Sequence, residues 1–284
     1  MNIIRITDLD APELEVFSGL SEVQLMRYYE PELGIFIAES ANVILRALEA
    51  GYEPISLLIE EHRMEREGAP VLQMIGERFG TPFLEQIPIY TAGHDIVTKL
   101  TGYCLVRGLW AVLRRRKTQP LSQFVAGKDR IAVLTDVVNP TNVGAIIRSA
   151  AALGMDGVVL THGSVDPLTR RSARVSMGTV FQIPWTMLSK QESEGAEHIR
   201  LLQQLGFQTA AMALTDDSVG VDDPEVKAAS KLAVVLGTEG DGLPDEVIGA
   251  CTFRVKIPMY HGVDSLNVAA ASAVIFWELT KEKA

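Results

Sequence analysis

Cysteine and aromatic residues are scarce in this chain. Only two cysteines occur among its 284 residues, and aromatic residues make up 6% of the composition. Cys104 and Cys251 are far apart, with no spacing typical of a metal site, and the five histidines are scattered along the chain. The sequence therefore predicts neither a disulfide framework nor a metal centre.

Long apolar runs are also absent. No run reaches the roughly 18 residues that a membrane-spanning helix needs, and the N-terminal sequence MNIIRITDLDAPELE lacks the regions of a secretory signal. Hydrophobic residues still make up 47% of the chain and charged residues 22%, which is the balance of a globular protein with a sizeable core. We expect a cytoplasmic protein without a membrane partner.

Basic residues are outnumbered by acidic ones, 26 to 36, and the formal net charge is −10. A nucleic-acid-binding protein is expected to carry a basic patch, and basic residues gather here in only two places. One is the run Arg114–Lys117, for which a solvated surface and a nucleic-acid contact are equally open. The other is the cluster Arg170, Arg171 and Arg174.

Strand and helix patterns alternate along the whole chain, which predicts a layered α/β structure. The length suits two domains of roughly 150 residues each. A polar segment that begins at Arg114 and contains Pro120 and Gly127 separates two stretches of apolar periodicity. We therefore expect a smaller N-terminal domain, a linker and a second domain, over residues 1–115, 116–129 and 130–284.

Two blocks near the C-terminus each begin as an apolar strand and stop at residues suited to backbone contacts. They are LAVVLGTEGDGLP at 232–244 and VKIPMYHGVDSLNVAAA at 255–271. Glycine lets a ligand approach the main chain closely, so these strand ends predict a small-molecule pocket. The order G-x-x-G-x-G differs from the dinucleotide fingerprint G-x-G-x-x-G, and no suitable helix follows directly, so a Rossmann site is not predicted.

A third block, DVVNPTNVGAIIRSA at 136–150, completes a recognisable pattern. In order, the three blocks resemble the motifs of the SpoU/TrmH family of RNA ribose 2′-O-methyltransferases, which belong to the SPOUT class. The first motif is matched by Asn142, Gly144 and Arg148, the second by LGTEG at 236–240, and the third by IPM at 257–259 with SLNVA at 265–269. One such block would be weak because apolar strands often end in glycine. Three in the family's order, covering about residues 128 to 280, are specific.

The resemblance implies a fold, a reaction and an assembly. SPOUT domains form an α/β knot, a deep trefoil knot whose crossing loops hold S-adenosylmethionine. The N-terminal half is similar, more loosely, to the small ribosomal-protein-like domain that binds substrate RNA in many members. The implied reaction transfers a methyl group to a ribose 2′-hydroxyl of RNA, with rRNA favoured over tRNA because of that domain. A homodimer through the C-terminal domain is implied as well, with the arginine of the first motif approaching the partner's cofactor.

The matched positions carry the implied roles. The catalytic residues are expected to be Arg148, Asn142, Glu239, Ser265 and Asn267. The cofactor is expected to contact Gly237, Ile257 and Leu266, with Leu236 and Met259 as close neighbours. We expect RNA phosphates at Arg170, Arg171 and Arg174, which lie between the first two motifs.

Each role has a simpler alternative in the sequence. A guanidinium stays protonated, with a pKa above ~12, so we expect Arg148 to hold phosphate and stabilise developing charge rather than act as a base. Asn142, Ser265 and Asn267 stand at predicted helix starts, where capping is the alternative role. The apolar positions of the predicted pocket would otherwise be read as core residues.

Two further functions remain open. One is a knotted RNA-binding protein that has lost catalysis, which would have no chemical need for all five predicted catalytic residues. The other is a SPOUT enzyme that methylates a base, which the N-x-G-x-x-x-R form of the first motif disfavours. The sequence names neither the RNA nor the nucleotide.

Overall fold

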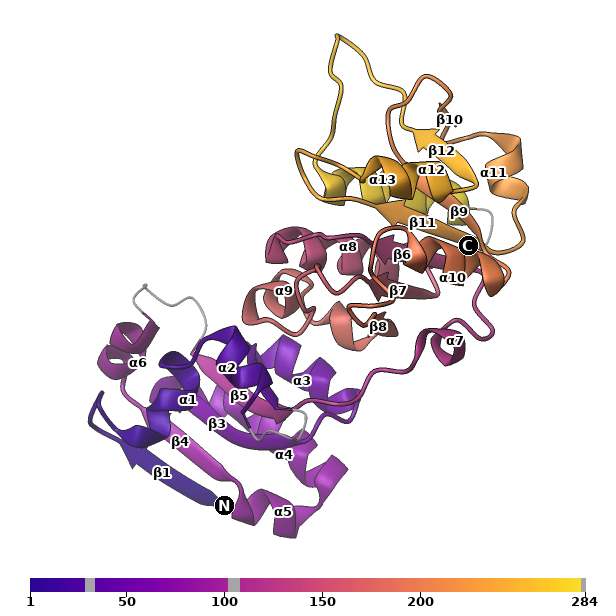
Figure 1. The fold of residues 1–284 in the computed structure, drawn as a ribbon. Coiled ribbons are helices and arrows are strands. Elements are labelled where there is room, and N and C mark those ends of the chain that lie inside the picture. Colours follow the sequence, from indigo (N-terminus) through magenta and orange to yellow (C-terminus); the bar gives the residue numbers. More distant parts are fainter. Residues whose placement is uncertain (29–33, 102–107, 282–284) are drawn as a thin grey trace. The chain divides into compact units, whose positions relative to one another are not determined.

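A computed structural model describes residues 1–28, 34–101 and 108–281, and the chain divides into two compact units (Figure 1). Unit 1 comprises Met1–Lys117 with Leu168–Phe181, and unit 2 comprises Thr118–Pro167 with Gln182–Ala284. The first boundary lies close to the predicted linker. Segment Leu168–Phe181 differs from the predicted organisation, because it lies within the expected second domain in sequence but packs into unit 1.

Unit 1 contains a five-stranded mixed sheet. Its strands are β1 (Asn2–Ile6), β2 (Ile35–Glu39), β3 (Pro54–Glu60), β4 (Pro88–Ala92) and β5 (Leu109–Arg114). Their order is β1-β4-β3-β5-β2, in which β1, β4 and β3 are parallel and β5 is antiparallel to both of its neighbours. The apolar strands β2, β3 and β5 are buried along almost their whole length, whereas β1 is an exposed edge.

Unit 1 also contains a set of helical segments. They are η1 (Pro12–Leu14), α1 (Glu15–Ser18), α2 (Glu22–Met26), α3 (Ala41–Glu49), η2 (Glu61–Arg63), η3 (Met64–Gly68), α4 (Ala69–Phe79), α5 (Thr81–Gln86), α6 (His94–Thr101), α9 (Arg170–Val175) and η4 (Thr179–Phe181). Phe17 of α1 and Leu25 of α2 share one core with Ile37, Leu58 and Trp110 of the sheet. The glycine predicted to end α6, Gly102, lies outside the described residues.

Unit 2 contains a seven-stranded sheet. Its strands are β6 (Arg130–Leu134), β7 (Gly157–Leu160), β8 (Trp185–Met187), β9 (Gln208–Met212), β10 (Val219–Gly220), β11 (Leu232–Leu236) and β12 (Phe253–Lys256). The order is β10-β12-β9-β11-β6-β7-β8, and every neighbouring pair is parallel. Strands buried on both faces need continuous apolar sequences, and β6, β7 and β11 are buried throughout. The predicted α/β class is confirmed.

The helices of unit 2 are α7 (Leu121–Phe124), α8 (Pro140–Ala152), α10 (Glu197–Gln204), α11 (Pro224–Ala228), α12 (Asp245–Ala250) and α13 (Val268–Thr280). Helices α8 and α13 pack against each other. Short helix α7 lies inside the predicted linker, yet its Leu121 and Phe124 are buried in a core with residues of α10 and α12. The predicted linker is therefore part of unit 2 from Thr118 onward. Within the described ranges, no helix has the length and apolar character needed to cross a membrane.

Candidate active site

A pocket of about 960 Å³ opens at the carboxyl ends of β9, β11 and β12 in unit 2. Ligands of open α/β sheets bind at this edge, and small-molecule sites typically have volumes of about 300–1,000 Å³. The wall is built from the segments that follow these three strands and from the start of α13. They are residues 212–215, 236–243, 255–257 and 264–268, and Asp245, Ile248, Met259 and Ala271 line the pocket as well.

The predicted cofactor-binding residues converge on this pocket. All of them line it, namely Leu236, Gly237, Ile257, Met259 and Leu266. Three of the predicted catalytic residues line it as well, namely Glu239, Ser265 and Asn267. Two predicted strand ends thus come together in one cavity, although their roles toward a ligand stay predictions.

The sequence analysis missed the wall that residues 212–215 supply. This segment follows β9, which lies between β11 and β12 in the sheet. A strand end at about Ala213 could be predicted from the sequence, but its neighbours in the sheet could not. Because β9 is central to these three strands, its carboxyl end necessarily contributes to the same pocket.

The glycine-rich loop after β11 folds back on itself. Thr238 and Gly242 form an isolated antiparallel bridge, and Gly240 and Gly242 have φ values of +89° and +70°. A β-carbon added at Gly237 would overlap the backbone of Gly242 and Leu243. The bare backbone at Gly237 is therefore needed by the loop itself, and its contact with a ligand stays a prediction.

Asn267 connects the three motifs. Its side-chain oxygen accepts hydrogen bonds from the backbone of Ala269 (2.9 Å) and Ala270 (3.3 Å) and so caps α13. Its Nδ2 donates to Oδ1 of Asn142 at 3.2 Å and to the carboxylate of Glu239. The predicted capping role and the predicted site role of Asn267 are thus compatible in one side chain.

Asn142 does not cap α8, although its predicted place at the helix start suggested that role. The N-cap of α8 is Asn139, whose side chain accepts a hydrogen bond from the backbone of Thr141 at 2.9 Å. Asn142 lies one turn further on and is 5% exposed. Its Nδ2 has no hydrogen-bond partner in the described part of the chain. Leaving a buried donor unpaired costs roughly 1–3 kcal/mol, so a ligand that accepted from this amide would bind more tightly.

Arg148 lies away from this cluster. It is exposed, and the structure shows no hydrogen bond or ion pair of its side chain within residues 1–28, 34–101 and 108–281. Six residues of helix separate it from Asn142, which corresponds to about 9 Å along the axis and a different face. Asn142, Glu239 and Asn267 are therefore brought together within one chain, and Arg148 is not. Ser265 lines the pocket, and its hydroxyl donates to Asp264 at 3.2 Å.

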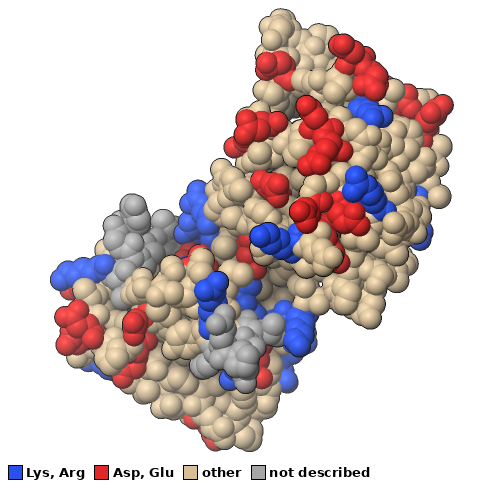
Figure 2. Space-filling model, in the orientation of Figure 1, with Lys and Arg blue, Asp and Glu red and all other residues tan. Residues whose placement is uncertain are grey.

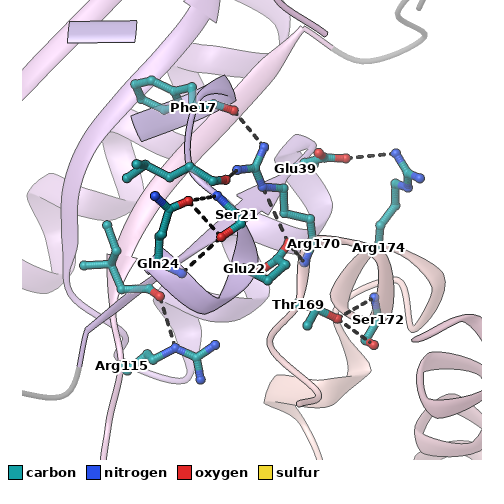
Figure 3. A network of polar contacts seen from close by, with 12 residues as sticks. Phe17, Ser21, Glu22, Gln24, Glu39, Arg115, Thr169, Arg170, Ser172 and Arg174 are labelled. Carbon is teal, nitrogen blue, oxygen red and sulfur yellow. Dashed lines mark hydrogen bonds and ion pairs between the residues drawn. The ribbon is translucent and has the colours of Figure 1, made fainter. Parts of the chain in front are cut away.

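The arginine cluster of α9 makes contacts inside unit 1 (Figure 3). The guanidinium of Arg170 donates to the carbonyls of Phe17 (2.7 Å) and Leu20 (3.3 Å). Arg174 donates to the carboxylate of Glu39 at 3.0 Å, while Arg171 is exposed. RNA contact by this cluster stays a prediction, and at Arg170 and Arg174 it competes with these bonds.

The basic run that begins at Arg114 is also used structurally. Arg115 donates to the carbonyl of Ile35 at 3.0 Å (Figure 3), and Arg116 donates to the carbonyl of Ala50 at 2.9 Å, next to the end of α3. Cationic side chains are favourable at helix C-termini because the last carbonyls lack partners. This run therefore stabilises the fold of unit 1.

Most of the net negative charge of the chain belongs to unit 2, because its acidic residues are matched by fewer lysines and arginines than those of unit 1. On the face shown in Figure 2, acidic side chains predominate over this unit, and lysine and arginine side chains stand singly among them. The three arginines of segment Leu168–Phe181 make unit 1 much less acidic. The net charge of unit 1 therefore repels a polyanion less than that of unit 2.

The parallel sheet, with a small-molecule pocket at the carboxyl edge of its strands, defines unit 2 as an α/β ligand-binding domain. Residues 129–277 match the SpoU rRNA Methylase family. A protein of Mycobacterium tuberculosis named an uncharacterised tRNA/rRNA methyltransferase is 32% identical over 284 residues, covering 99% of this chain and 93% of its own. A protein of the same description from Archaeoglobus fulgidus is 31% identical, covering 81% of this chain and 86% of its own. The chain therefore belongs to the SpoU/TrmH family, as its three motifs predict.

Solved structures share this fold along the whole chain. The AdoMet-bound rRNA methyltransferase from Sinorhizobium meliloti has a TM-score of 0.81 at 22% identity and covers 99% of both chains. The SpoU methyltransferase AviRb from Streptomyces viridochromogenes, in complex with AdoMet, has a TM-score of 0.74 at 21% identity. It covers 95% of this chain and 97% of its own.

Proposed function

We propose that this chain is an S-adenosylmethionine-dependent methyltransferase that acts on a ribose 2′-hydroxyl of RNA, with rRNA favoured over tRNA. One observation carries the proposal: Asn142, Glu239 and Asn267, one from each motif, are joined by hydrogen bonds beside the pocket. The names of the relatives, tRNA/rRNA methyltransferases, support RNA as the substrate. The AdoMet-bound neighbours support the cofactor.

The residues present fit S-adenosylmethionine. The pocket has apolar side chains at Leu236, Ile257 and Leu266, which suit the faces of an adenine ring, and polar backbone groups in its loops. Buried Asn142 is joined to the pocket wall through Asn267, and its unpaired Nδ2 is proposed to donate to a bound group. When bound, the cofactor supplies an electrophilic methyl group on a sulfonium.

The side chains of this protein must then position the RNA and stabilise charge. Asn267 fixes the carboxylate of Glu239, which faces the substrate side of the pocket in this proposal. Ser265 stands at the pocket wall, where its hydroxyl can reach the ribose. Arg148 holds the phosphate and stabilises the alkoxide charge that develops on the 2′-oxygen. Holding the reactants in line can lower the barrier by roughly 7–11 kcal/mol.

A homodimer explains how Arg148 reaches the site. Helix α13 is apolar on every side, which is typical of a buried helix, yet Val274 and Trp277 are 40% and 56% exposed. Val138 and Leu266 are exposed on the same unit. A second copy that covers these residues would bring its own Arg148 to this pocket, so the active site is shared in this proposal.

The proposal includes the trefoil knot and the role of unit 1. The loops after β11 and β12, which cross in a SPOUT knot, line a single pocket here, and that supports the knot. Unit 1 is proposed to bind substrate RNA, which its less acidic charge supports. The competing functions are a knotted RNA-binding protein without catalysis and a methyltransferase that acts on a base.

Methyl transfer to RNA tests the proposal directly. Ribosomal RNA from a strain lacking this gene is incubated with the protein and S-adenosylmethionine, then digested to nucleosides and analysed by mass spectrometry. We expect a 2′-O-methylated nucleoside, whose formation slows by roughly 10²–10³ in Arg148→Ala because a charge-stabilising donor is lost. Arg200→Ala, on the surface of unit 2, is the control and should retain full activity. A methylated base would support the base-modifying alternative, and RNA binding without any methylation would support the non-catalytic one.

A further inference from the structure

Unit 1 holds a second group of chemically reactive side chains, far from the motifs in sequence. We propose that Glu60, His62 and His94 form a binding site for a divalent metal ion of the zinc class. One carboxylate oxygen and two imidazole nitrogens lie within 4.8 Å of one another. The proposal is independent of methyl transfer.

The three ligands are placed by parallel strands. Glu60 is the last residue of β3, and His94 opens α6 directly after β4, its parallel neighbour in the sheet (Figure 1). His62 follows β3 in the 3₁₀ turn η2. The carboxyl edge of parallel strands is where α/β sheets bind ligands, so the group stands at a position suited to a site.

Distances around Glu60 suit a small cation. Its Oε1 lies 2.6 Å from Nδ1 of His94 and 3.0 Å from Nε2 of His62. In tetrahedral zinc with bonds of about 2.0–2.1 Å, two ligand atoms lie about 3.3 Å apart. Both histidines are more than half exposed, at 53% for His94 and 64% for His62, so they can move outward by the roughly 0.7 Å and 0.3 Å that such a site requires.

The carboxylate is held in place by its own neighbours. The side chain of Glu60 is 1% exposed, and its second oxygen accepts a hydrogen bond from Nε of Arg63 at 2.8 Å. Arg63 in turn is fixed by Glu67 at 2.5 Å. A β-carbon at Gly108 would overlap the Glu60 carboxylate, so that backbone closes one side of the group. Such support of a ligand by hydrogen bonds is typical of metal sites.

The two histidines direct different ring nitrogens to the same oxygen of Glu60. His94 directs Nδ1 to Glu60, and its Nε2 lies 3.4 Å from the hydroxyl of Thr98, which can accept its proton and fix the tautomer. His62 directs Nε2 to the same oxygen. Two imidazoles and one carboxylate make the donor set of zinc sites that keep a fourth position for water or another ligand.

Zinc titration of the full chain tests this site without any activity measurement. After treatment with a chelator and its removal, calorimetry with ZnCl₂ should show one saturable site per chain. We expect His62→Ala and His94→Ala to bind about tenfold more weakly or worse, since even losing a supporting residue costs 10–100-fold. His162→Ala removes an exposed histidine from unit 2 and should bind as the unchanged protein does.

Cobalt provides a second measurement at the same residues. Co²⁺ bound by two imidazoles and a carboxylate should give visible absorption bands that Glu60→Gln and His94→Ala abolish. No saturable zinc site, or zinc affinity unchanged in both histidine variants, would overturn the proposal. An equal loss in His162→Ala would overturn it as well, because binding would then be a general property of surface histidines. None of these outcomes bears on methyl transfer in unit 2.

Discussion

Asn267 combines two roles that substitution can separate. Its oxygen caps α13, and its Nδ2 joins Asn142 to Glu239. Aspartate caps a helix about as well as asparagine does, whereas alanine in place of a good cap costs roughly 0.5–2 kcal/mol. Aspartate, however, has no N–H to donate.

We therefore expect Asn267→Asp to keep the cap of α13 and to lose most methyl transfer, and its carboxylate, which faces that of Glu239, should lower the unfolding midpoint. Asn267→Ala should lose activity and also unfold at a lower temperature. Adding Glu239→Gln to Asn267→Asp returns a donor to the pair and should recover part of the activity. Thermal unfolding and the nucleoside assay measure the two effects. Full activity in Asn267→Asp would mean that this side chain serves only as a cap.

His198 is a buried titratable group at the centre of unit 2. It is fully buried, and its Nε2 lies 3.2 Å from the hydroxyl of Thr135. Burial lowers the pKa of His198, an effect that the nearby carboxylate of Asp136 only partly opposes. The folded state therefore keeps this imidazole neutral at a pH where the unfolded state binds a proton.

Acidification should lower the free energy of unfolding of unit 2, because His198 is buried in its neutral form. Between its usual pKa near 6.5 and the lowered value in the fold, the unfolded chain binds more protons, so the free energy of unfolding falls as pH falls. The slope approaches about 1.4 kcal/mol per pH unit for one group. Urea unfolding at pH 7.5 and 5.5 should show a smaller loss in His198→Gln than in the unchanged protein. Equal losses in the two proteins would show that other groups carry the acid sensitivity.

At the scale of elements, α9 and its flanks are the main departure from chain order. Arg46 donates to the carbonyl of Met177 at 2.5 Å. The ring of Phe181 packs against the rings of Phe36 and Tyr52, with centroids 5.8 and 5.2 Å apart. With the bonds of Arg170, these contacts hold the whole segment in unit 1. Segment Leu168–Phe181 thus lies between the first two motifs in sequence but is part of unit 1 in the fold.

We expect Arg170→Ala to destabilise unit 1. The carbonyls of Phe17 and Leu20 lose a charged donor, and hydrogen bonds to charged groups contribute roughly 1.5–3 kcal/mol each at most. Arg66→Ala removes an exposed arginine of the same unit, so it is the control and should change the free energy of unfolding by less than about 0.5 kcal/mol. Hydrogen exchange of the β2 amides reads out unit 1 alone. Equal protection in both variants would contradict the anchoring role of Arg170.

The sequence predicted local features of the site better than long-range ones. Strand ends and their glycines follow from local patterns, so the pocket wall after β11 and β12 could be predicted. Asn142 is the expected cap of α8, yet Pro140 at the first helical position is a local signal that favours Asn139. His62 and His94 meet only because β3 and β4 are neighbours, so their spacing in the chain shows no metal motif.

At the scale of the whole molecule, the position of Arg148 decides how the active site is assembled. Within one chain it lies on a different face of α8 from Asn142, and no side chain of the described residues pairs with it. Because Arg148 has no partner among the residues of its own chain that the structure describes, it would break no hydrogen bond or ion pair on contacting the pocket of a second copy. The exposed apolar residues of α13 offer a surface on which a second copy can pack.

Mixed dimers test whether the site is shared. One protomer carries Arg148→Ala, and the other carries Ala213→Phe, which fills the pocket at its β9 wall and leaves the glycine loop intact. Each homodimer should be inactive, the first without its charge-stabilising donor and the second without cofactor binding. Mixing should restore one working centre per mixed dimer, built from the intact pocket of one chain and Arg148 of the other. After equal mixing, about half of the dimers are mixed, and each mixed dimer has one working centre of two. The activity should therefore recover to roughly a quarter of that of the unchanged protein. The Arg148→Ala centres add little, because a lost donor costs roughly 10²–10³ in rate. If subunits exchange and activity stays absent, the site is built within one chain, and Arg148 acts on the pocket of its own subunit.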